Sequence, residues 1–492
     1  MSDQLGKKRA SSAKEWSQEP VSIPDQWAYV NFDDVFDNLS LTGLKIPQKE
    51  YETSGVYPVV DQGADLIGGY TNDEGKVINL RRPVVVFGDH TKCFKYLPFP
   101  FAPGADGVKV LIPKGEVDGK YLFYACKALQ LPDRGYSRHF SFLKKCKFPL
   151  PPKDEQRDIV AKIETLFSEL DKGIESLKAA REQLKAYRQA VLKHAFEGKL
   201  TEQWRQQNPD KLESPEQLLA RIQQEREQRY QQQLEGWKRA IKIWESNDKE
   251  GKKPGKPSAY KTQPAIENEE LEKLPSLPEC WGYVRLAEIA AIGSGMSVSK
   301  DRKLADPVEV PYLRVANVQR GMLVLHEIKT MPVERLSLSA LKLQRWDILF
   351  NEGGDRDKLG RGWVWENQIE PCITQNHVFR ATPYMTDEFH SKFISHWGNT
   401  FGQLYFEKSG KQTTNLASIN KAALSGFPVP LPSMEEQRKI IEVLDDLTSL
   451  IDSFENDIEI ELAKSETLRQ SILKRAFSGH IIRKGPGVEV SA

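Results

Sequence analysis

Long hydrophobic runs are absent from this sequence, and none approaches the ~18 apolar residues that a membrane-spanning helix needs. The first residues, Met1 to Arg9, contain no apolar segment, so no signal peptide is expected. Cysteine is scarce and no Cys-x-x-Cys motif occurs, which is typical of free thiols in a reducing compartment. The five cysteines are Cys93, Cys126, Cys146, Cys280 and Cys372. Together these absences predict a cytoplasmic protein.

An excess of charge of one sign is also missing, because the formal net charge is only +1. This excludes a uniformly basic nucleic-acid-binding protein, so any DNA-binding surface must be local or shared with partners. His90 and Cys93 have a spacing that a metal ion tolerates, but no second pair of ligands accompanies them. No metal site is therefore expected.

Motifs of the common catalytic sites are lacking as well. The chain contains neither G-x-G-x-x-G nor the phosphate-binding loop G-x-x-x-x-G-K-[ST]. Asn208-Pro-Asp is not the Asn/Asp-Pro-Pro-aromatic motif of an adenine-amine methyltransferase, and Asp133-Arg-Gly lacks the Glu-x-Lys of a nuclease. No nucleophile elbow is present either. We therefore expect no catalytic site of the chain's own.

What the sequence does contain is a long internal repeat, the feature to seek first in any chain. Residues 148–198 and residues 427–479 each start with a Pro-rich stretch and continue as one helical pattern. From Glu155 to Gly198 the two copies align at a constant offset of 281 residues, without a gap. Each predicted helix has about 42 residues, or about 63 Å at 1.5 Å per residue. Gly198 and Gly479 occupy the position at which helices commonly stop.

A shorter repeat precedes each of these stretches. The phrase Ile23-Pro-Asp-Gln-Trp27 returns as Leu277-Pro-Glu-Cys-Trp281 at an offset of 254 residues. The chain therefore reads as variable region, helix, variable region, helix. The predicted parts are a disordered arm at 1–22, a first globular domain at 23–148, a helix at 149–198, a polar helical or flexible connector at 199–276, a second globular domain at 277–427, a helix at 428–479 and a tail at 480–492.

Both variable regions are punctuated by Gly and Pro and contain short β-type runs. These runs lie at 56–60, 77–80, 84–87 and 108–112 in the first region, and at 310–315, 322–325 and 347–350 in the second. A helical piece near 119–130 accompanies the first set. The pattern favours an α+β fold, in which two globular domains are separated by two long antiparallel coiled-coil helices as a pseudo-two-fold tandem repeat.

The apolar residues of the two helices recur at the a and d positions of a heptad. The predicted seam consists of Ile163, Leu166, Leu170, Leu177, Leu184, Tyr187 and Val191 in the first helix, and of Leu444, Leu447, Ile451, Phe454, Ile458, Leu468 and Ile472 in the second. Glu461 and Ser465 interrupt the second copy, so the pairing is imperfect. Two such helices can still bury most of these side chains against each other.

Antiparallel packing of these helices would place the two domains at opposite ends of a rod, related by a pseudo-two-fold axis. B-DNA has two-fold axes of its own perpendicular to the duplex, so one chain could read two half-sites as a symmetric dimer does. Because the two domains differ in sequence, the half-sites should differ too. The repeat therefore predicts an asymmetric, split DNA target.

Over most of residues 24–485 the chain resembles the specificity subunit of type I restriction–modification enzymes. The strongest carriers are the two Pro-Leu/Val-Pro…Glu-Gln-Arg helix starts, the two Leu-Lys-x-Ala-Phe-x-Gly helix ends and the duplicated order. Supporting phrases are Val86-Phe-Gly-Asp-His-Thr91, Arg138-His-Phe-Ser-Phe-Leu143, Tyr312-Leu-Arg-Val-Ala-Asn317, Asp347-Ile-Leu-Phe350, Leu359-Gly-Arg361 and Gln412-Thr-Thr-Asn-Leu416.

This resemblance implies two target-recognition domains, each reading half of a bipartite DNA site, and two helices that act as spacer and docking surface. It also implies two methyltransferase subunits as partners, and two translocase–nuclease subunits in the restricting complex. No cofactor is expected on this chain, whereas S-adenosylmethionine, ATP and Mg²⁺ are expected in the partner subunits. The connector is longer and richer in Gln than the family pattern. The alternative is a two-domain coiled-coil scaffold without sequence-specific DNA binding.

Candidate DNA contacts are basic, amide and aromatic side chains in the predicted loops. They are His90, Lys92, Arg134, Tyr136, Arg138 and His139 in the first domain, and Arg314, Asn317, Arg356, Lys358, Arg361, Lys411, Gln412 and Thr413 in the second. The Gly-rich stretch from Glu352 to Gly362 would allow a close approach to a DNA backbone. The alternative for each candidate is a structural role in a solvated loop, and for Arg314 and Asn317 that alternative is favoured.

The two Glu-Gln-Arg motifs, at 155–157 and 436–438, lie in the predicted first turns of the helices. Acidic side chains are favourable at a helix N-terminus because they complement its partial positive charge. We therefore favour a capping role for the motifs over direct contact with a partner protein.

Overall fold

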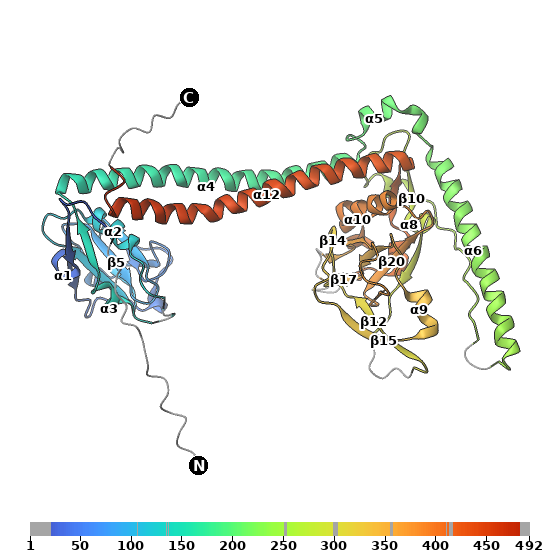
Figure 1. Ribbon diagram of the computed structural model, residues 1–492, viewed down its shortest axis with the longest axis horizontal. Coiled ribbons are helices and arrows are strands. Elements are labelled where there is room, and N and C mark those ends of the chain that lie inside the picture. Colours follow the sequence, from blue (N-terminus) through green and yellow to red (C-terminus); the bar gives the residue numbers. More distant parts are fainter. Residues whose placement is uncertain are drawn as a thin grey trace, which may run out of the picture. The chain divides into compact units, whose positions relative to one another are not determined.

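The computed structural model describes residues 21–105, 107–133, 135, 137–249, 253–298, 304–354, 358–409, 411–412 and 417–482. Nearly all of the predicted N-terminal arm and most of the predicted tail lie outside these residues. The chain divides into two compact units, Met1–Arg181 with Asn456–Ala492, and Glu182–Glu455. Each unit holds one globular domain and one part of each of two long helices, α4 (Lys153–Phe196) and α12 (Met434–Phe477) (Figure 1).

Domain 1, the globular part of the first unit, mixes short strands with short helices. Its elements are β1 (Ala28–Asn31), α1 (Phe32–Val35), β2 (Phe36–Leu39), β3 (Tyr57–Val60), β4 (Gly69–Thr71), β5 (Val84–Gly88), β6 (Phe94–Leu97), β7 (Ala102–Pro103), β8 (Val108–Pro113), α2 (Gly119–Ala128), α3 (Phe140–Leu143) and β9 (Lys147–Leu150). The main sheet has the order β2-β8-β5-β6, and a smaller sheet has the order β4-β3-β7.

Strand β5 is buried along its whole length, as a continuous Val/Phe run predicts for a strand covered on both faces. Its side chains alternate between two cores because successive residues of a strand point to opposite faces. Val85 and Phe87 pack in one core with α2, whereas Val84 and Val86 pack in another. The loop that follows β5 is thereby held at the edge of a rigid sheet.

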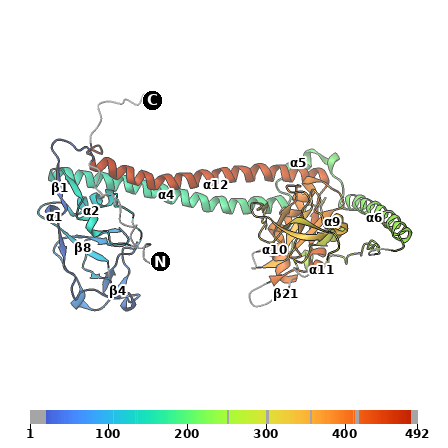
Figure 2. The same cartoon turned by 60° about the horizontal axis from the view of Figure 1, so that its bottom comes forward.

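Domain 2 is the globular part of the second unit and contains α9, α10 and α11 (Figure 2). It repeats the topology of domain 1 with a different sequence. Its elements are β10 (Gly282–Arg285), α8 (Leu286–Ile289), β11 (Ala290–Ser294), β12 (Pro307–Leu313), β13 (Val318–Gln319), β14 (Met322–Leu323), β15 (Lys329–Glu334), α9 (Arg335–Leu341), β16 (Ile348–Asn351), β17 (Gly353–Gly354), β18 (Gly362–Val364), β19 (Ile373–Thr374), β20 (Val378–Pro383), α10 (Glu388–Ser409), β21 (Lys411–Gln412), β22 (Ala417–Ser418), α11 (Lys421–Ser425) and β23 (Pro428–Leu431). The sheets β11-β20-β16-β18 and β15-β12-β19 match those of domain 1 in order. Strand β16 therefore occupies the place of β5.

The two repeated sequence phrases meet as neighbouring strands in each unit. Strand β1 directly follows the first copy of the shorter repeat, residues 23–27, and pairs antiparallel with β9, which leads into α4. Strand β10 directly follows the second copy, residues 277–281, and pairs in the same way with β23, which leads into α12. We call these two copies the head phrases. In both units this pair of strands lies at the start of the long helix. The head phrase and the Pro-rich stretch thus recur together because the strands next to them pair with each other and form one structural joint.

Both long helices end at a glycine in the left-handed conformation, with φ of +69° at Gly198 and +77° at Gly479. Glycine adopts this conformation at little steric cost. Both positions are also crowded by a proline of a head phrase. A Cβ on Gly198 would lie 2.4 Å from Cγ of Pro278, and a Cβ on Gly479 would lie 2.3 Å from Cγ of Pro24. Each helix end is therefore packed against the joint of its unit.

The substitution Gly198→Ala should lower the free energy of unfolding of the second unit by about 1–3 kcal/mol, the cost of a non-glycine residue in this conformation. Thermal unfolding of the variant chain measures the effect. The matched control is Gly173→Ala in the middle of α4, where a Cβ would meet no atom within 4 Å. This control should be neutral or stabilising by up to about 1 kcal/mol. Equal losses in both variants would contradict the role assigned to Gly198.

The Gln of each Glu-Gln-Arg motif locks the start of its helix to the domain. Gln156 donates from Nε2 to the carbonyl oxygen of Pro151 (3.0 Å) and accepts from the backbone N–H of Asp118 (2.9 Å). Gln437 donates to the carbonyl oxygen of Pro432 (2.8 Å), and its Oε1 lies 2.7 Å from Nδ1 of His390. Both side chains are buried. The motif thus joins helix to domain in both copies.

Glu436 has a role that a capping interpretation misses. Its carboxylate is fully buried and accepts hydrogen bonds from Thr201 Oγ1 (2.7 Å), the Arg205 guanidinium (2.5 Å) and Trp281 Nε1 (2.8 Å). Ser433 caps the helix instead, because its Oγ accepts the backbone N–H of Glu436 (3.3 Å). The carboxylate therefore ties the start of α12 to the chain that follows α4 and to the head phrase of domain 2.

Ion pairs join α4 and α12 within each unit. In the first unit Asp171 pairs with Arg469, and Arg181 lies 2.8 Å from Glu459. In the second unit Arg188 lies 2.5 Å from Asp452. In all three pairs the residue number on α12 falls by as much as the number on α4 rises, which is the register of antiparallel neighbours.

The two apolar ladders of these helices differ in exposure. Six residues of the first ladder are buried: Ile163 and Val191 in α4, and Leu444, Ile451, Ile458 and Ile472 in α12. Leu170, Leu177 and Leu184 of the same ladder are half-buried, as are Leu166 and Leu447. Tyr187, Phe454 and Leu468 of the other ladder are about half exposed, at 50%, 48% and 51%. Of the buried residues, Ile163 and Ile472 lie in the core of domain 1, and Val191 and Leu444 lie in the core of domain 2.

The connector at 199–276 contains the helices α5 (Glu202–Gln207), α6 (Pro215–Ser246) and α7 (Asn268–Leu271). Helix α6 begins with the N-cap Ser214, whose Oγ accepts the backbone N–H of Gln217 (3.3 Å). Leu218 and Ile222 of α6 are buried in the core of domain 2. The connector is therefore docked on domain 2. Among the described helices none is long and apolar enough to cross a membrane.

Candidate nucleic-acid interface

In domain 1 a buried aspartate joins two loops that carry candidate DNA contacts. Asp89 directly follows β5 and is 4% exposed. Its carboxylate accepts the backbone N–H groups of His139 (2.8 Å) and Phe140 (2.7 Å). Its carbonyl oxygen lies 3.0 Å from Nδ1 of His139, which is fully buried. We call this arrangement the Asp89 clamp; it holds together loops that are 50 residues apart in sequence.

Cationic side chains surround the Asp89 clamp. Lys92, in a left-handed backbone conformation, lies 3.4 Å from the Asp133 carboxylate. The backbone N–H of Gly135, and then Lys92, hold the pKa of Asp133 below its ordinary value. Because an exposed Lys–Asp pair contributes little to stability, Lys92 can exchange this partner for a phosphate at small cost. Arg138 is exposed on the neighbouring loop.

His90 is placed by a glycine of a third loop. A Cβ on Gly107 would lie 3.0 Å from the His90 ring and 2.4 Å from Oε1 of Gln62. The carbonyl oxygen of Gly107 also accepts the backbone N–H of Asp89 (2.7 Å). The structure thus brings His90, Lys92, Arg138 and His139 together at one end of β5.

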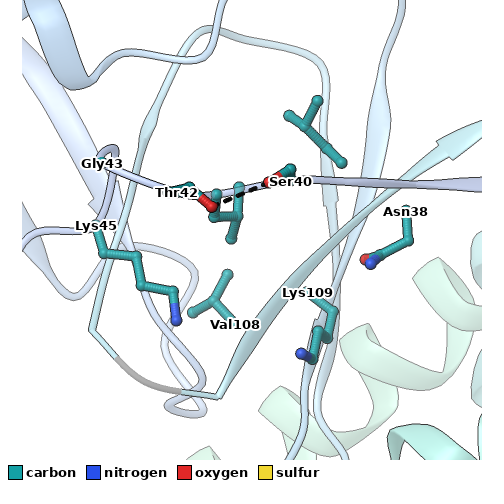
Figure 3. Close-up of a pocket in the computed structure, with 9 residues that line it drawn as sticks. Asn38, Ser40, Thr42, Gly43, Lys45, Val108 and Lys109 are labelled. Atoms are coloured by element: carbon teal, nitrogen blue, oxygen red, sulfur yellow. Dashed lines mark hydrogen bonds between the residues drawn. The ribbon is translucent and has the colours of Figure 1, made fainter.

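A pocket of about 430 Å³ opens beside this site, and two lysines line it (Figure 3). Lys45 comes from the loop after β2 and Lys109 from β8, and none of the nine described residues that line the pocket is acidic. The ammonium of Lys109 lies 5.2 Å from the centre of the Phe140 ring, and that of Lys144 lies 5.7 Å from the same ring. Phe140 therefore connects the pocket to the Asp89 clamp. A pocket of this charge suits an anionic group such as a DNA phosphate.

Lys45 and Lys109 are binding candidates that sequence reasoning missed. Both are single lysines within otherwise ordinary segments, so neither belongs to a basic run. Only the folding of β2 and β8 as neighbouring strands brings the two segments to one pocket.

In domain 2 the candidate segments gather at the equivalent place, the end of β16. Asn351 is buried, and its Nδ2 donates to the carbonyl oxygen of Val318 (2.8 Å). The backbone N–H of Asn351 donates to the carbonyl oxygen of Arg361 (2.9 Å). Asn351 therefore links the loop that carries Arg314 and Asn317 to the Gly-rich loop.

The third candidate segment contains Lys411 and Gln412, and it is joined to the Gly-rich stretch by a small sheet of order β17-β22-β21. Strand β17 is part of the Gly-rich stretch, and β21 contains Lys411 and Gln412. The backbone N–H of Ile419, just after β22, donates to the carbonyl oxygen of Glu352 (2.7 Å). The backbones of Gly353–Gly354 and Lys411–Gln412 thereby pair with the same strand, β22.

Arg314 and Asn317 take part in the structure of their own loop. Asn317 is 3% exposed; its Oδ1 accepts the backbone N–H of Arg314 (2.9 Å), and its Nδ2 donates to the carbonyl oxygens of Val324 and Glu327. The Arg314 guanidinium lies 3.4 Å from the Glu327 carboxylate. These contacts support the structural alternative that the sequence favoured for both residues.

Several other candidates allow fewer statements. Lys358 and Arg361 are half-buried in the Gly-rich loop. Lys411 and Gln412 are placed only by their backbone in β21. Arg134, Tyr136, Arg356 and Thr413 lie outside the described residues. For all of these residues DNA contact remains a prediction.

A histidine–carboxylate pair at this site was not a sequence candidate. Nδ1 of His377 lies 2.6 Å from Oε2 of Glu352, and the His377 side chain is 54% exposed. The backbone N–H of Glu352 also donates to the carbonyl oxygen of His377 (2.9 Å). An exposed imidazole next to the Gly-rich loop can donate a hydrogen bond to a phosphate or to a guanine acceptor. The two residues are 25 positions apart, so no local pattern indicates the pair.

Asp347 stands at the other end of β16 and has a structural role. Its carboxylate is fully buried and accepts the backbone N–H of Gln344 (2.7 Å) as well as the hydroxyl of Thr382. Burial raises the pKa of Asp347 to about 6. The Asp-Ile-Leu-Phe phrase therefore combines a turn-stabilising acid with a buried strand.

A sequence model of the family described as "Type I restriction modification DNA specificity domain" matches residues 24–179 and 278–464 of this chain. The match covers more than half of the chain and both globular domains. It passes over residues 180–277, which include α5, α6 and α7.

Curated relatives and one solved structure agree with this match. The chain is 25% identical over 347 residues to the specificity subunit of the type I restriction enzyme EcoDI of Escherichia coli. The aligned region covers 68% of this chain and 62% of that protein. It is 25% identical over 339 residues to the EcoBI specificity subunit of Escherichia coli, at 68% and 58% coverage. The chain thus spans less than two thirds of the length of these relatives. A structure described as the "Structural basis underlying complex assembly and conformational transition of the type I R-M system" contains a chain with the same fold, at a TM-score of 0.56, 18% identity, and coverage of 94% of this chain and 100% of that one.

Proposed function

The chain belongs to the DNA specificity family of type I restriction–modification systems, and we propose that it is the subunit that recognises the DNA sequence. Each domain reads one half of a bipartite, asymmetric site. One observation carries this proposal: both domains use the same strand order and gather polar loops at the end of the equivalent strand, β5 or β16, but with different side chains. A repeated framework with different loops suits two readers of different half-sites.

The proposed DNA contacts fall into two groups, those that position each domain on the duplex and those that distinguish bases. Lys45, Lys92 and Lys109 in domain 1 suit phosphate contacts, which hold the domain on the duplex. Arg138 and His90, and His377 in domain 2, suit hydrogen bonds to base edges in the major groove. His139 and Asn317 are buried and support the loops that carry these side chains.

In this proposal α4 and α12 form an antiparallel coiled coil that sets the distance between the half-sites. The matching register of the three ion pairs supports this arrangement, and so does the burial of Ile451 and Ile458, which lie outside the cores of the two domains. Helices of equal length, each running from one domain to the other, make the chain a pseudo-two-fold tandem repeat. The domain boundaries proposed from the sequence follow the same scheme.

The partners in this proposal are two methyltransferase subunits and, in the restricting complex, two translocase–nuclease subunits. Tyr187 and Phe454, the half-exposed ladder residues of the second unit, are a suitable docking surface for apolar helices of the methyltransferase. Catalysis belongs to the partners, which would bind S-adenosylmethionine, ATP and Mg²⁺. This chain contributes recognition and geometry.

Sequencing of methylated bases in DNA from cells that express this chain with its methyltransferase tests the proposal. We expect methylation within a split, asymmetric sequence, which disappears when this chain is deleted. Methylation of continuous palindromes alone would contradict the proposal. The purified complex should also retain the matching duplex less well as salt rises, because phosphate contacts release counterions. A scaffold without DNA recognition would show no preference among duplexes.

A further inference from the structure

Helix α6 and the segment that returns from it form an arm on domain 2, and beyond the base of the helix the exposed lysines and arginines of this arm form no ion pair within the described part of the chain. Helix α6 has 32 residues, a length of about 48 Å at 1.5 Å per residue. Its first half is docked, and Arg229 donates to the carbonyl oxygens of Pro383 (3.3 Å) and Tyr384 (3.0 Å). The second half, residues 230–246, continues past this contact for about 25 Å (Figure 1). We call residues 230–249 and 253–261 the distal arm.

The distal arm is held in a defined shape by its return segment. Trp237 Nε1 donates to the carbonyl oxygen of Pro254 (3.1 Å). The Arg226 guanidinium lies 3.6 Å from the centre of the Tyr260 ring. Further along, Arg285 of domain 2 donates to the carbonyl oxygen of Pro264 (3.3 Å). The return segment is therefore fastened to α6 at two points and to domain 2 at a third.

Positive charge is concentrated on this arm. The described residues from 235 to 261 include seven Lys or Arg but only three Asp or Glu, in a chain whose net charge is +1. Lys238, Arg239 and Lys242 are exposed on α6, and Lys253, Lys256 and Lys261 are exposed on the return segment. Within the described part of the chain none of these six forms an ion pair.

The cations near the base of α6 behave differently. Arg221 forms an ion pair with Glu213 (2.7 Å). Arg226 and Arg229 contact Tyr260, Tyr384 and the carbonyl groups of domain 2. The base of the helix thus uses its cations for internal contacts, whereas the distal arm presents them to solvent.

Apolar side chains accompany these exposed cations. Ile243 is 62% exposed, and the Lys253 ammonium lies 5.8 Å from the centre of the half-buried Trp244 ring. An exposed group of cations suits a polyanion such as the phosphate backbone of a duplex. The family match passes over this segment, so the arm is an addition to the matched framework.

We propose that the distal arm is a second DNA-binding surface, which contacts phosphates of the duplex flanking the half-site read by domain 2. This inference rests on the proposed function and extends the contact beyond the recognised sequence. Lysine is a point charge on a flexible stem, so these contacts add affinity without reading bases. An arm of about 25 Å reaches along up to about seven base pairs at roughly 3.4 Å each.

The test compares the intact methyltransferase complex with a complex that carries Lys238→Gln, Arg239→Gln and Lys242→Gln together. Two duplexes contain the same recognition sequence; one ends at the half-site of domain 2, and the other continues beyond it for about ten base pairs, or about one helical turn. The wild-type complex should bind the longer duplex more tightly. The variant should bind both alike, and its slope of log affinity against log salt should fall by up to about 2.7, or about 0.9 for each lost phosphate contact. The methylated sequence should not change.

The matched control exchanges the same cations without loss of charge, as Lys238→Arg, Arg239→Lys and Lys242→Arg, and should keep the flank preference. A wild-type complex that binds its site but ignores the flank would overturn the arm and leave the proposed function standing. A neutral variant that keeps the flank preference would overturn the arm too. A wild-type complex without sequence preference on either duplex would overturn the proposed function itself.

Discussion

Removing residues 174–180 together with residues 460–466 should bring the two half-sites of the methylated sequence about three base pairs closer. Seven residues are one heptad, so the seam keeps its phase. The helices shorten by about 10 Å at 1.5 Å per residue, which corresponds to about three base pairs at roughly 3.4 Å each. The two segments face each other, because the pairs Asp171–Arg469 and Arg181–Glu459 flank them.

Sequencing of methylated bases measures the spacer directly. The original sequence should lose its methylation, and the same two half-sites should be methylated at the shorter spacing. The control deletes residues 174–180 alone, which puts the ion pairs that follow out of register. That variant should methylate neither sequence. If the double deletion left the original spacer unchanged, the helices would not set the distance between the half-sites.

The substitution Glu436→Ala should lower the free energy of unfolding of the second unit by about 3–5 kcal/mol, the usual cost of removing one partner of a buried ion pair. The Arg205 side chain is only 13% exposed and would lose its counterion. Trp281 Nε1 would lose its acceptor within a buried environment. Hydrogen exchange of domain 2, measured in the complex, should rise while that of domain 1 stays unchanged.

The equivalent position in the first helix provides a matched control. Glu155 is half-buried, and Trp27 Nε1, the counterpart of Trp281 Nε1, is buried without a hydrogen-bond partner among the described residues. The substitution Glu155→Ala should therefore cost less than about 0.5 kcal/mol, like most changes of exposed side chains. Glu436→Gln should fall between the two, since the amide oxygen can still accept from Trp281. Equal losses at 155 and 436 would contradict the role assigned to the buried carboxylate.

The repeat shows how far a linear pattern can lead. The constant offset of 281 residues and the two terminal glycines indicate two equal helices, and α4 and α12 both have 44 residues. The heptad pattern, however, does not tell which ladder is covered. Ile451 and Phe454 look equivalent in sequence, but the first is buried and the second is 48% exposed. That difference depends on where the neighbouring helix lies, which periodicity along one helix does not contain.

The candidate site shows where the linear pattern stops. The sequence indicated candidate loops near Lys92 and Arg138, but the link between them is the Asp89 carboxylate, which accepts the backbone N–H of His139, 50 positions away. Lys45, Lys109 and the Glu352–His377 pair gave no signal because each residue is isolated in its own segment. The charge of the distal arm was equally hidden, since Lys238 and Lys256 look like parts of a polar linker.

The sequence by itself determined the family, the duplicated order and the helix ends, because repeats, periodicity and glycine conformation are local properties of the chain. Tertiary structure decided which side chains meet at the ends of β5 and β16, which carboxylate of the two repeated motifs is buried, and which cations of α6 remain without partners. Those outcomes depend on hydrogen bonds and packing between segments far apart in the sequence. Contacts of that kind arise only when the sheets have closed and the helices have found their neighbours.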